Sequence, residues 1–193
     1  VVEMRKEKNL TRADFIQNLI NDKSENLSLI DMTAQTMTFF IDGYLVSANE
    51  MSFMLYMIAI HPEVQKRLRK ELNSFKELDF DTLHHLEYLD AVFNETLRLY
   101  PPAITLSREC NQDTTINVNG NKYEFKVGDL IEIPAFAIHR DPQHFKNPFH
   151  FYPDRFLSEP NNPAALLTFS VGPRACPGSR FAKTVIKAGI AAL

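Results

Sequence analysis

The chain has 193 residues, 45% of them hydrophobic, which is typical of a globular domain with a sizeable core and excludes a disordered chain. Its formal net charge is −3 at pH 7, which excludes the strongly basic surface that attracts nucleic acid. The sequence holds 2 cysteines, too few for a disulfide framework, and its intracellular composition disfavours a bridge between Cys110 and Cys176.

Neither end of the sequence carries a start or stop signal. Val1 is not an initiating residue, and no signal peptide follows it. The last segment repeats apolar residues at helical spacing as far as Leu193 without a cap. We therefore expect a fragment of a longer protein.

The first half of the sequence predicts helices. Residues 29–60 contain no proline and are rich in Met, Phe, Leu and Ile, which predicts one long helix buried in a large protein. Charged and amide side chains interrupt this run, at Asp42, Asn49 and Glu50, so it lacks the continuous apolar stretch of a membrane span. Pro62 occupies a favoured first-turn position of the next helix.

The second half mixes one more helix with strands and irregular chain. The segment "YLDAVFNETLRLYPP" predicts a helix that Pro101 closes. Asn119 and Gly120 lie between alternating residues and predict a hairpin, and "DLIEIP" predicts another short strand. Residues 141–173 show little periodicity, which is often a sign of function, and Pro177 is expected to begin the final helix. We expect a mainly α fold with a small β portion.

One of the two cysteines lies in the segment "FSVGPRACPG", residues 169–178. Cys176 directly precedes the expected helix start, whose free N–H groups stabilise a thiolate. Gly172 and Gly178 allow the backbone to pass close to something large and flat, and Arg174 is placed to pair with an anionic group on it. Haem fits this description, because it carries propionates and accepts a cysteine thiolate as an axial iron ligand.

Two other interpretations of this segment are weaker. A tetrahedral zinc site needs further Cys or His at close spacing, and none has that spacing. A buried structural cysteine in a glycine-rich turn explains the Cys and Gly alone. It does not explain the joint pattern, which arises by chance about once in ten million positions. The pattern consists of Phe169, Gly172, Arg174, Cys176 and Gly178.

The segment resembles the haem-binding loop of the cytochrome P-450 family, the haem-thiolate monooxygenases. Other segments resemble family motifs in the same order: "ETLR" at 95–98, "HRDP" at 139–142, and "FYPDRF" at 151–156 with Asp154 in place of Glu. The resemblance implies one partial catalytic domain, residues 1–193, from the C-terminal part of the fold. Its elements are a long central helix, a Glu-x-x-Arg helix, short hairpins, an irregular meander, the Cys loop and a final helix. The resemblance is strongest to the animal microsomal branch.

The resemblance implies roles for individual residues. Cys176 would ligate the iron of haem b. Glu95 and Arg98 face the same side of a helix, a pair that alone is usually a solvated surface contact; the resemblance implies a buried pair, completed by Arg155, that holds the core around the haem. Arg108 matches a position that pairs with a propionate, the alternative being a surface arginine on a strand. The other cofactor-contacting positions are Phe169, Gly172, Arg174 and Gly178.

Other positions have simpler expectations. An apolar wall beside the haem would suit a hydrophobic substrate, and its residues are Ala103, Ile104 and Leu106. His139 and Arg140 are expected to begin a loop, without a catalytic role. Cys110 is expected to be a buried small residue.

The long helix departs from the family's oxygen-activating motif. The aligned residues read, in order, Asp42, Gly43, Tyr44, Leu45, Val46 and Ser47. Leu45 and Val46 fill the acid and alcohol positions, and neither side chain donates or relays a proton. The candidate catalytic residues are therefore Gly43, which leaves room for oxygen, Ser47, and the unusual acid Asp42.

The resemblance implies an enzyme that inserts one atom of O2 into a lipophilic substrate, with electrons from an NADPH-dependent reductase. It also implies membrane contact through a preceding N-terminal part and a place on the cytosolic face of the endoplasmic reticulum membrane. No nucleic-acid partner is expected. Two alternatives stay open: a haem-thiolate isomerase or dehydratase that acts on a peroxide, and a catalytically impaired haem-binding remnant. The changes at Leu45 and Val46 favour both alternatives, whereas the intact motifs around Cys176 argue against decay.

Overall fold

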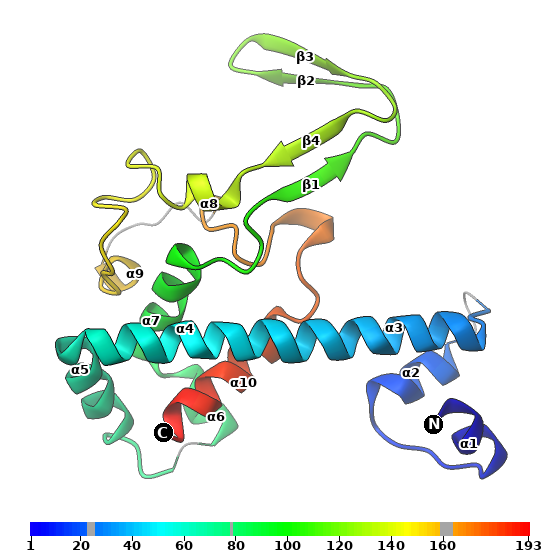
Figure 1. Ribbon diagram of the computed structural model, residues 1–193, viewed down its shortest axis with the longest axis horizontal. Coiled ribbons are helices and arrows are strands. Elements are labelled where there is room, and N and C mark those ends of the chain that lie inside the picture. Colours follow the sequence, from blue (N-terminus) through cyan, green and yellow to red (C-terminus); the bar gives the residue numbers. More distant parts are fainter. Residues whose placement is uncertain (23–25, 78, 159–163) are drawn as a thin grey trace. The chain divides into compact units, whose positions relative to one another are not determined.

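The structure is a computed structural model that describes residues 1–22, 26–77, 79–158 and 164–193. The chain divides into two compact units, residues 1–48 and 49–193, which are described separately. Helices make up most of the regular structure, and the strands form small antiparallel sheets in the second unit, as Figure 1 shows. This architecture confirms the expected mainly α fold with a small β portion.

The first unit is held by an ion pair and an aromatic stack between its helices. These helices are α1 (Val2–Glu7), α2 (Phe15–Asn21) and α3 (Leu29–Ile41). The Arg5 guanidinium donates to both carboxylate oxygens of Asp14, at 2.7 and 2.6 Å. Asp14 is also the N-cap of α2, so one side chain joins α1 to the start of α2. Phe15 stacks on Phe39 of α3 with ring centroids 4.4 Å apart.

The long helix is continuous but not uniform. Three segments follow one another without a break: α3, the π-helical segment η1 (Asp42–Val46) and α4 (Ser47–Ile60). The helix expected over residues 29–60 is confirmed, and its burial within a larger protein stays a prediction. In α3 only Met32 is buried, and Ile30 is 80% exposed; within the first unit α3 packs against α2. No helix in the described part of the chain is both long enough and apolar enough to cross a membrane.

The helices of the second unit pack around α7. They include α5 (Pro62–Leu72), α6 (Phe80–His84), α7 (Glu87–Leu99) and α10 (Ser179–Ala191). Helix α7 has 13 residues, of which 10 are buried. Its apolar side chains pack with Met54 of α4, Leu68 of α5 and Ile186 of α10. Pro62 begins α5, and α7 ends just before Pro101, so both expected helices are confirmed.

Helix α10 is fixed by a partly buried ion-pair cluster and a close helix contact. Lys187, which is 1% exposed, places its Nζ 2.6 Å from Oδ1 of Asp90 on α7. Lys183 Nζ donates to the other oxygen of the same carboxylate at 2.8 Å. Gly189 allows close approach to α4, because a Cβ there would lie 2.5 Å from the Met51 methyl carbon. A buried lysine requires a paired carboxylate of this kind.

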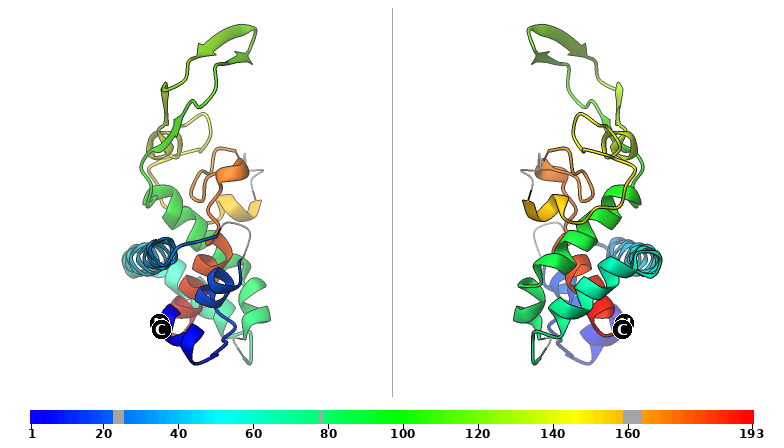
Figure 2. Two further views of the ribbon diagram at one scale, coloured as in Figure 1. Left: turned by 90° about the vertical axis from the view of Figure 1, so that its right-hand side faces the viewer. Right: turned by 90° about the vertical axis from the view of Figure 1, so that its left-hand side faces the viewer.

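Two antiparallel ladders follow α7. They are β1 (Leu106–Glu109) with β4 (Leu130–Ile133), and β2 (Thr114–Val118) with β3 (Asn121–Phe125). Asn119 and Gly120 have φ values of 50° and 83°, as a type I′ turn requires, so the predicted hairpin is confirmed. The strand predicted in "DLIEIP" is β4. Figure 2 shows that hairpin β2–β3 lies beyond the β1–β4 ladder, away from α7.

The chain between β4 and α10 is mostly irregular, as expected for the described residues of 141–173. Its short helical turns are α8 (Ala135–Ile138), α9 (Arg155–Ser158) and η2 (Gly172–Arg174). The final helix begins at Ser179 and not at Pro177, so the expected start is wrong by two residues. Gly178, with φ −88° and ψ 7°, stands outside the helix as its N-cap, and Pro177 precedes it in a turn.

Candidate functional site

Cys176 is a free and exposed cysteine in a tightly turned loop. Its backbone N–H donates to the Phe169 carbonyl at 2.8 Å, and the Ala175 N–H donates to the Gly172 carbonyl at 3.0 Å. Gly172 has a φ of 80°, a left-handed conformation that a side chain would strain. These bonds hold the backbone around the sulfur while the thiol itself stays open to a ligand. The other cysteine, Cys110, is free and buried, as expected.

The sulfur lies next to the start of α10. A Cβ added to Gly178 would lie 3.9 Å from Cys176 Sγ, and Gly178 is the N-cap of α10. The Ala182 N–H bonds to the Gly178 carbonyl at 2.8 Å, so the N–H groups before it have no partner within the helix. These groups and the positive end of the helix dipole lie at the same end of α10 as the sulfur.

Two further side chains connect this loop to the rest of the second unit. Arg108 of β1 donates to Ser170 Oγ at 3.2 Å, so it is not an isolated surface arginine. Phe169 stacks on Phe93 of α7 with ring centroids 6.3 Å apart. Arg174 lies in η2 with its side chain exposed. The loop therefore carries the sulfur of Cys176 and is anchored to α7 through Phe169. The guanidinium of Arg108 on β1 contacts the same loop at Ser170.

Glu95, Arg98 and Arg155 form one buried network, with exposed fractions of 0%, 0% and 1%. Arg98 binds the Glu95 carboxylate in a bidentate manner, through Nε and Nη2, both at 2.8 Å. Arg155 Nε donates to the two oxygens of the same carboxylate at 3.2 and 3.1 Å. The structure therefore brings all three residues together, as the Glu-x-x-Arg and Pro-Asp-Arg-Phe motifs led us to expect.

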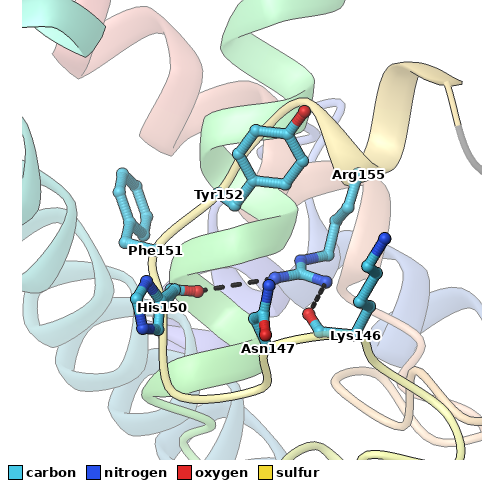
Figure 3. Close-up of a pocket in the computed structure, with 6 residues that line it drawn as sticks. All are labelled: Lys146, Asn147, His150, Phe151, Tyr152 and Arg155. Atoms are coloured by element: carbon cyan, nitrogen blue, oxygen red, sulfur yellow. Dashed lines mark hydrogen bonds between the residues drawn. The ribbon is translucent and has the colours of Figure 1, made fainter.

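One carboxylate faces two guanidinium groups, and backbone carbonyls satisfy the remaining donors. Arg98 Nη1 donates to the carbonyls of His139 and Pro148, each at 2.7 Å. Arg155 donates to the carbonyls of Lys146 at 2.7 Å and of His150 at 3.5 Å. Figure 3 shows the two bonds of Arg155 at a pocket in the irregular chain between β4 and α10, which we call the meander. Its lining residues are Lys146, Asn147, His150, Phe151, Tyr152 and Arg155.

The arrangement fits haem better than a metal ion held by protein side chains alone. In residues 1–22, 26–77, 79–158 and 164–193 no group of three His, Cys, Asp or Glu side chains is placed to hold a metal. A single thiolate is a sufficient protein ligand for haem, because the porphyrin supplies the other nitrogen ligands. Arg108 and Arg174 are cations suited to propionates, and glycine backbone around Cys176 permits a flat ring to approach.

The residues expected to form an oxygen-activating motif coincide with the π-helical segment of the long helix. Segment η1 covers Asp42–Val46, and such segments are frequent at functional sites because the wider turn displaces side chains and carbonyls from regular helix spacing. Asp42 is exposed, whereas Ser47 is buried. Leu45 and Val46 are exposed apolar residues, and the polar side chains of the segment are those of Asp42, Tyr44 and Ser47.

The expected substrate wall is only partly assembled in this chain. Ala103 and Ile104 are exposed, and Leu106 is half-buried as the first residue of β1. The described pockets are lined by other residues, those of the meander and of a groove between α6 and α10. The assignment of these three residues to a substrate pocket stays a prediction.

Glu50 is a buried acid to which the sequence analysis gave no role beyond interrupting an apolar run. It lies in α4 one helical turn after Val46, and only 2% of it is exposed. Among the described residues its Oε1 has no hydrogen-bond partner. Burial raises the pKa of Glu50 to about 8, so the carboxyl is mainly protonated at neutral pH. Its only sequence signal was an acid within an otherwise apolar helix.

We expect the free energy of unfolding to fall as pH rises between the unfolded and folded pKa values of Glu50. Its carboxyl has a pKa near 4.5 when unfolded and about 8 when folded, so its contribution is fully present below pH 4.5 and is lost by pH 8. Between these values the free energy of unfolding should fall by up to ~1.4 kcal/mol per pH unit. Denaturant titrations of wild type and Glu50→Gln measure this slope, which should be shallower in the variant. Equal slopes would contradict the assignment.

His139 is a second residue that sequence reasoning underestimated. It was expected only to begin a loop, yet its side chain is 0% exposed. Both ring nitrogens have partners, the Arg98 carbonyl at 3.2 Å and the Leu167 N–H at 2.9 Å. The partners lie 41 and 28 residues away in the chain, so no local pattern could have revealed them.

Comparison with known proteins places these features in a family. The Cytochrome P450 family model matches residues 1–193. The chain is 39% identical to cytochrome P450 3A9 of Rattus norvegicus, over 96% of this chain and 39% of that protein. It is 39% identical to cytochrome P450 3A13 of Mus musculus, with the same coverage, and 37% identical to probable cytochrome P450 9f2 of Drosophila melanogaster, over 98% of this chain and 41% of that protein. The chain thus spans about two fifths of the length of these curated relatives. With a free loop cysteine, a buried Glu-Arg-Arg network and a family match along its whole length, the chain belongs to the cytochrome P450 family.

Proposed function

We propose that the protein is a haem-thiolate monooxygenase that inserts one atom of O2 into a lipophilic substrate, and that residues 1–193 form part of its catalytic domain. The observation that carries the proposal is the exposed thiol of Cys176 at the start of α10. Its loop is bound to α7, the helix that contains Glu95 and Arg98. Membership of the cytochrome P450 family supports the same reading.

Each group of residues has a distinct task in this proposal. When bound, haem supplies the iron at which O2 is activated, and a thiolate ligand favours cleavage of the O–O bond. Cys176 is the iron ligand, and the first turn of α10 stabilises its negative charge. Arg108 and Arg174 bind the propionates, while Phe169, Gly172 and Gly178 shape the loop. The Glu95 network holds α7 and the irregular chain around Lys146 together.

The oxygen-activating motif has a proton-handling task in the same proposal. Gly43 leaves space for O2 because it has no side chain, and Ser47 and Asp42 hold or donate protons in place of the apolar Leu45 and Val46. Ala103, Ile104 and Leu106 contribute an apolar wall for the substrate.

The proposed reaction requires partners outside this chain. Insertion of one oxygen atom consumes two electrons, which an NADPH-dependent reductase supplies. Relatives named cytochrome P450 3A9 and 3A13 support placement in the animal microsomal branch, and so a place on the cytosolic face of the endoplasmic reticulum membrane. No nucleic-acid partner is proposed, since the net charge is −3.

One observation favours a second function. A haem-thiolate isomerase or dehydratase takes its oxygen from a peroxide and needs neither external electrons nor a proton relay. The apolar Leu45 and Val46 suit such an enzyme. Turnover of a lipid hydroperoxide without reductase would favour this function, whereas NADPH-driven consumption of O2 would favour the monooxygenase.

The proposal is tested by replacing the sulfur ligand. In the reduced, carbon-monoxide-treated protein, Cys176→Ser should abolish the absorption band that is characteristic of thiolate-ligated haem, because a hydroxyl stays protonated at neutral pH. Cys110→Ser is the matched control and should keep the band. Cys110 is buried, and its Sγ donates to the Gln112 carbonyl at 3.0 Å, a bond that a hydroxyl can also make.

The absorption bands of the wild type and the two variants are compared at equal haem content. If Cys176→Ser retains the band, the ligand assignment is wrong. If neither the wild type nor Cys110→Ser shows it, the protein is not a haem-thiolate enzyme.

A further inference from the structure

His139 connects α7 to the segment that enters the cysteine loop. Leu167 N–H donates to its Nε2 at 2.9 Å, so Nε2 is an acceptor and carries no proton. In a neutral imidazole the proton is then on Nδ1, which donates to the Arg98 carbonyl 3.2 Å away. The tautomer is therefore set by the backbone N–H of Leu167.

The connection to Arg98 runs in both directions. Arg98 Nη1 donates to the His139 carbonyl at 2.7 Å, while the His139 ring donates to the Arg98 carbonyl. The rings of His139 and Phe145 also meet edge to face, with centroids 6.3 Å apart and planes at 85°. Because Arg98 belongs to the Glu95 network, His139 occupies one fixed position in the core of the second unit.

The connection to Leu167 reaches the base of the cysteine loop. The Leu167 carbonyl accepts from the Ser170 N–H at 3.0 Å, and two residues after Leu167 the Phe169 carbonyl accepts from the Cys176 N–H at 2.8 Å. Leu167 is itself buried. A shift at Leu167 would therefore move the turn whose hydrogen bonds hold the backbone of Cys176.

The charges around His139 keep its ring neutral. Arg98 of α7 and Arg140, the next residue in the chain, are the charged groups that face it, and both oppose a positive ring. Burial and these two cations lower the pKa of His139 to about 4. The contribution of the neutral ring to stability is fully present above pH 6.5 and is lost as pH falls through 4, because an imidazolium cannot accept the Leu167 N–H.

We propose that His139 is a positioning residue for the haem thiolate: its Nε2 acceptor holds Leu167, and through Leu167 the loop that presents Cys176. The inference rests on the proposed function, since it concerns the sulfur as iron ligand. An ordinary core histidine would support packing alone. The two roles differ in which nitrogen matters, because only Nε2 faces the loop and only Nδ1 faces α7.

Two amide substitutions at His139 distinguish the role of Nε2 from that of Nδ1. The longer side chain of His139→Gln can place a carbonyl oxygen near the position of Nε2 and keep the acceptor for Leu167. The shorter side chain of His139→Asn can place an N–H near the position of Nδ1 and keep the donor to Arg98. The matched surface control is His144→Asn in the meander, where the side chain is exposed.

The experiment uses full-length, haem-loaded protein at pH 7.5 and compares variants at equal haem content. Two quantities are measured: the rate at which the reduced carbon-monoxide band of thiolate-ligated haem is lost, and amide hydrogen exchange at Leu167. In His139→Asn both should be faster by about tenfold or more, because a buried N–H loses its acceptor. In His139→Gln and His144→Asn both should stay within about twofold of wild type.

The outcomes distinguish this inference from the proposed function. A wild type without the thiolate band defeats both. A wild type with the band, and an Asn variant with wild-type rates, defeats only the role of His139. Should the Asn variant bind no haem, the Gln variant decides: a stable thiolate band supports the role, and a Gln variant as defective as the Asn variant overturns it.

Discussion

Replacing Glu95 with alanine should lower the free energy of unfolding by about 3–5 kcal/mol and leave the purified protein with little bound haem. The variant would leave Arg98 and Arg155 buried without a counter-charge, at 0% and 1% exposure. It would also remove the acceptor for the Tyr152 N–H, which bonds to Glu95 Oε1 at 2.8 Å. The loss therefore affects α7 and the meander together.

An exposed ion pair provides the matched control for this prediction. Lys126 and Asp113 lie 3.0 Å apart with side-chain exposures of 68% and 58%. Because water screens such a pair, Lys126→Ala should cost at most about 1 kcal/mol, since it leaves the bond from the Val127 N–H to Asp113 in place. Denaturant unfolding and the ratio of haem to protein measure both effects. Recovery of a fully haem-loaded Glu95→Ala protein that is merely slow would contradict a structural role for the network.

Elements specified by neighbouring residues could be predicted from the sequence. Pro62 begins α5 as a first-turn proline should, and Asn119-Gly120 forms the expected hairpin turn. The pairing of Glu95 with Arg98 follows from their separation of three residues on one helix. Each of these signals involves residues that are close in the sequence, so contacts with distant parts of the chain did not change the local structure.

Features that depend on distant contacts were not predictable in this way. His139 joins residues 41 and 28 positions away, and Asp90 meets Lys183 across 93 residues. The start of α10 was misplaced because Pro177 is an acceptable first helical residue, whereas the conformation of Gly178 delays the helix. The π-helical segment at Asp42–Val46 carries no sequence signal that is separate from the family motif.

Restoring the family pattern in that segment should improve the coupling of NADPH use to product formation. Positioned proton donors commonly contribute about 10²–10⁴-fold to rate, and Leu45 and Val46 cannot act as such donors. We expect the double variant Leu45→Glu/Val46→Thr to form more product per NADPH and to release less peroxide than the wild type. Leu29→Glu, the same exchange at the start of α3, is the control and should change neither quantity.

Asp42→Ala tests whether the unusual acid compensates for the apolar residues. Asp42 is exposed and begins η1, so its carboxylate is accessible to water. If it supplies protons, product per NADPH should fall below the wild-type value in Asp42→Ala, and the double variant should tolerate the same change because its new Glu replaces the lost acid. A wild type that is already tightly coupled, together with an Asp42→Ala variant that behaves identically, would show that water or Ser47 carries the protons. In that case the segment is a complete relay built from fewer side chains, and the apolar pair does not weaken it.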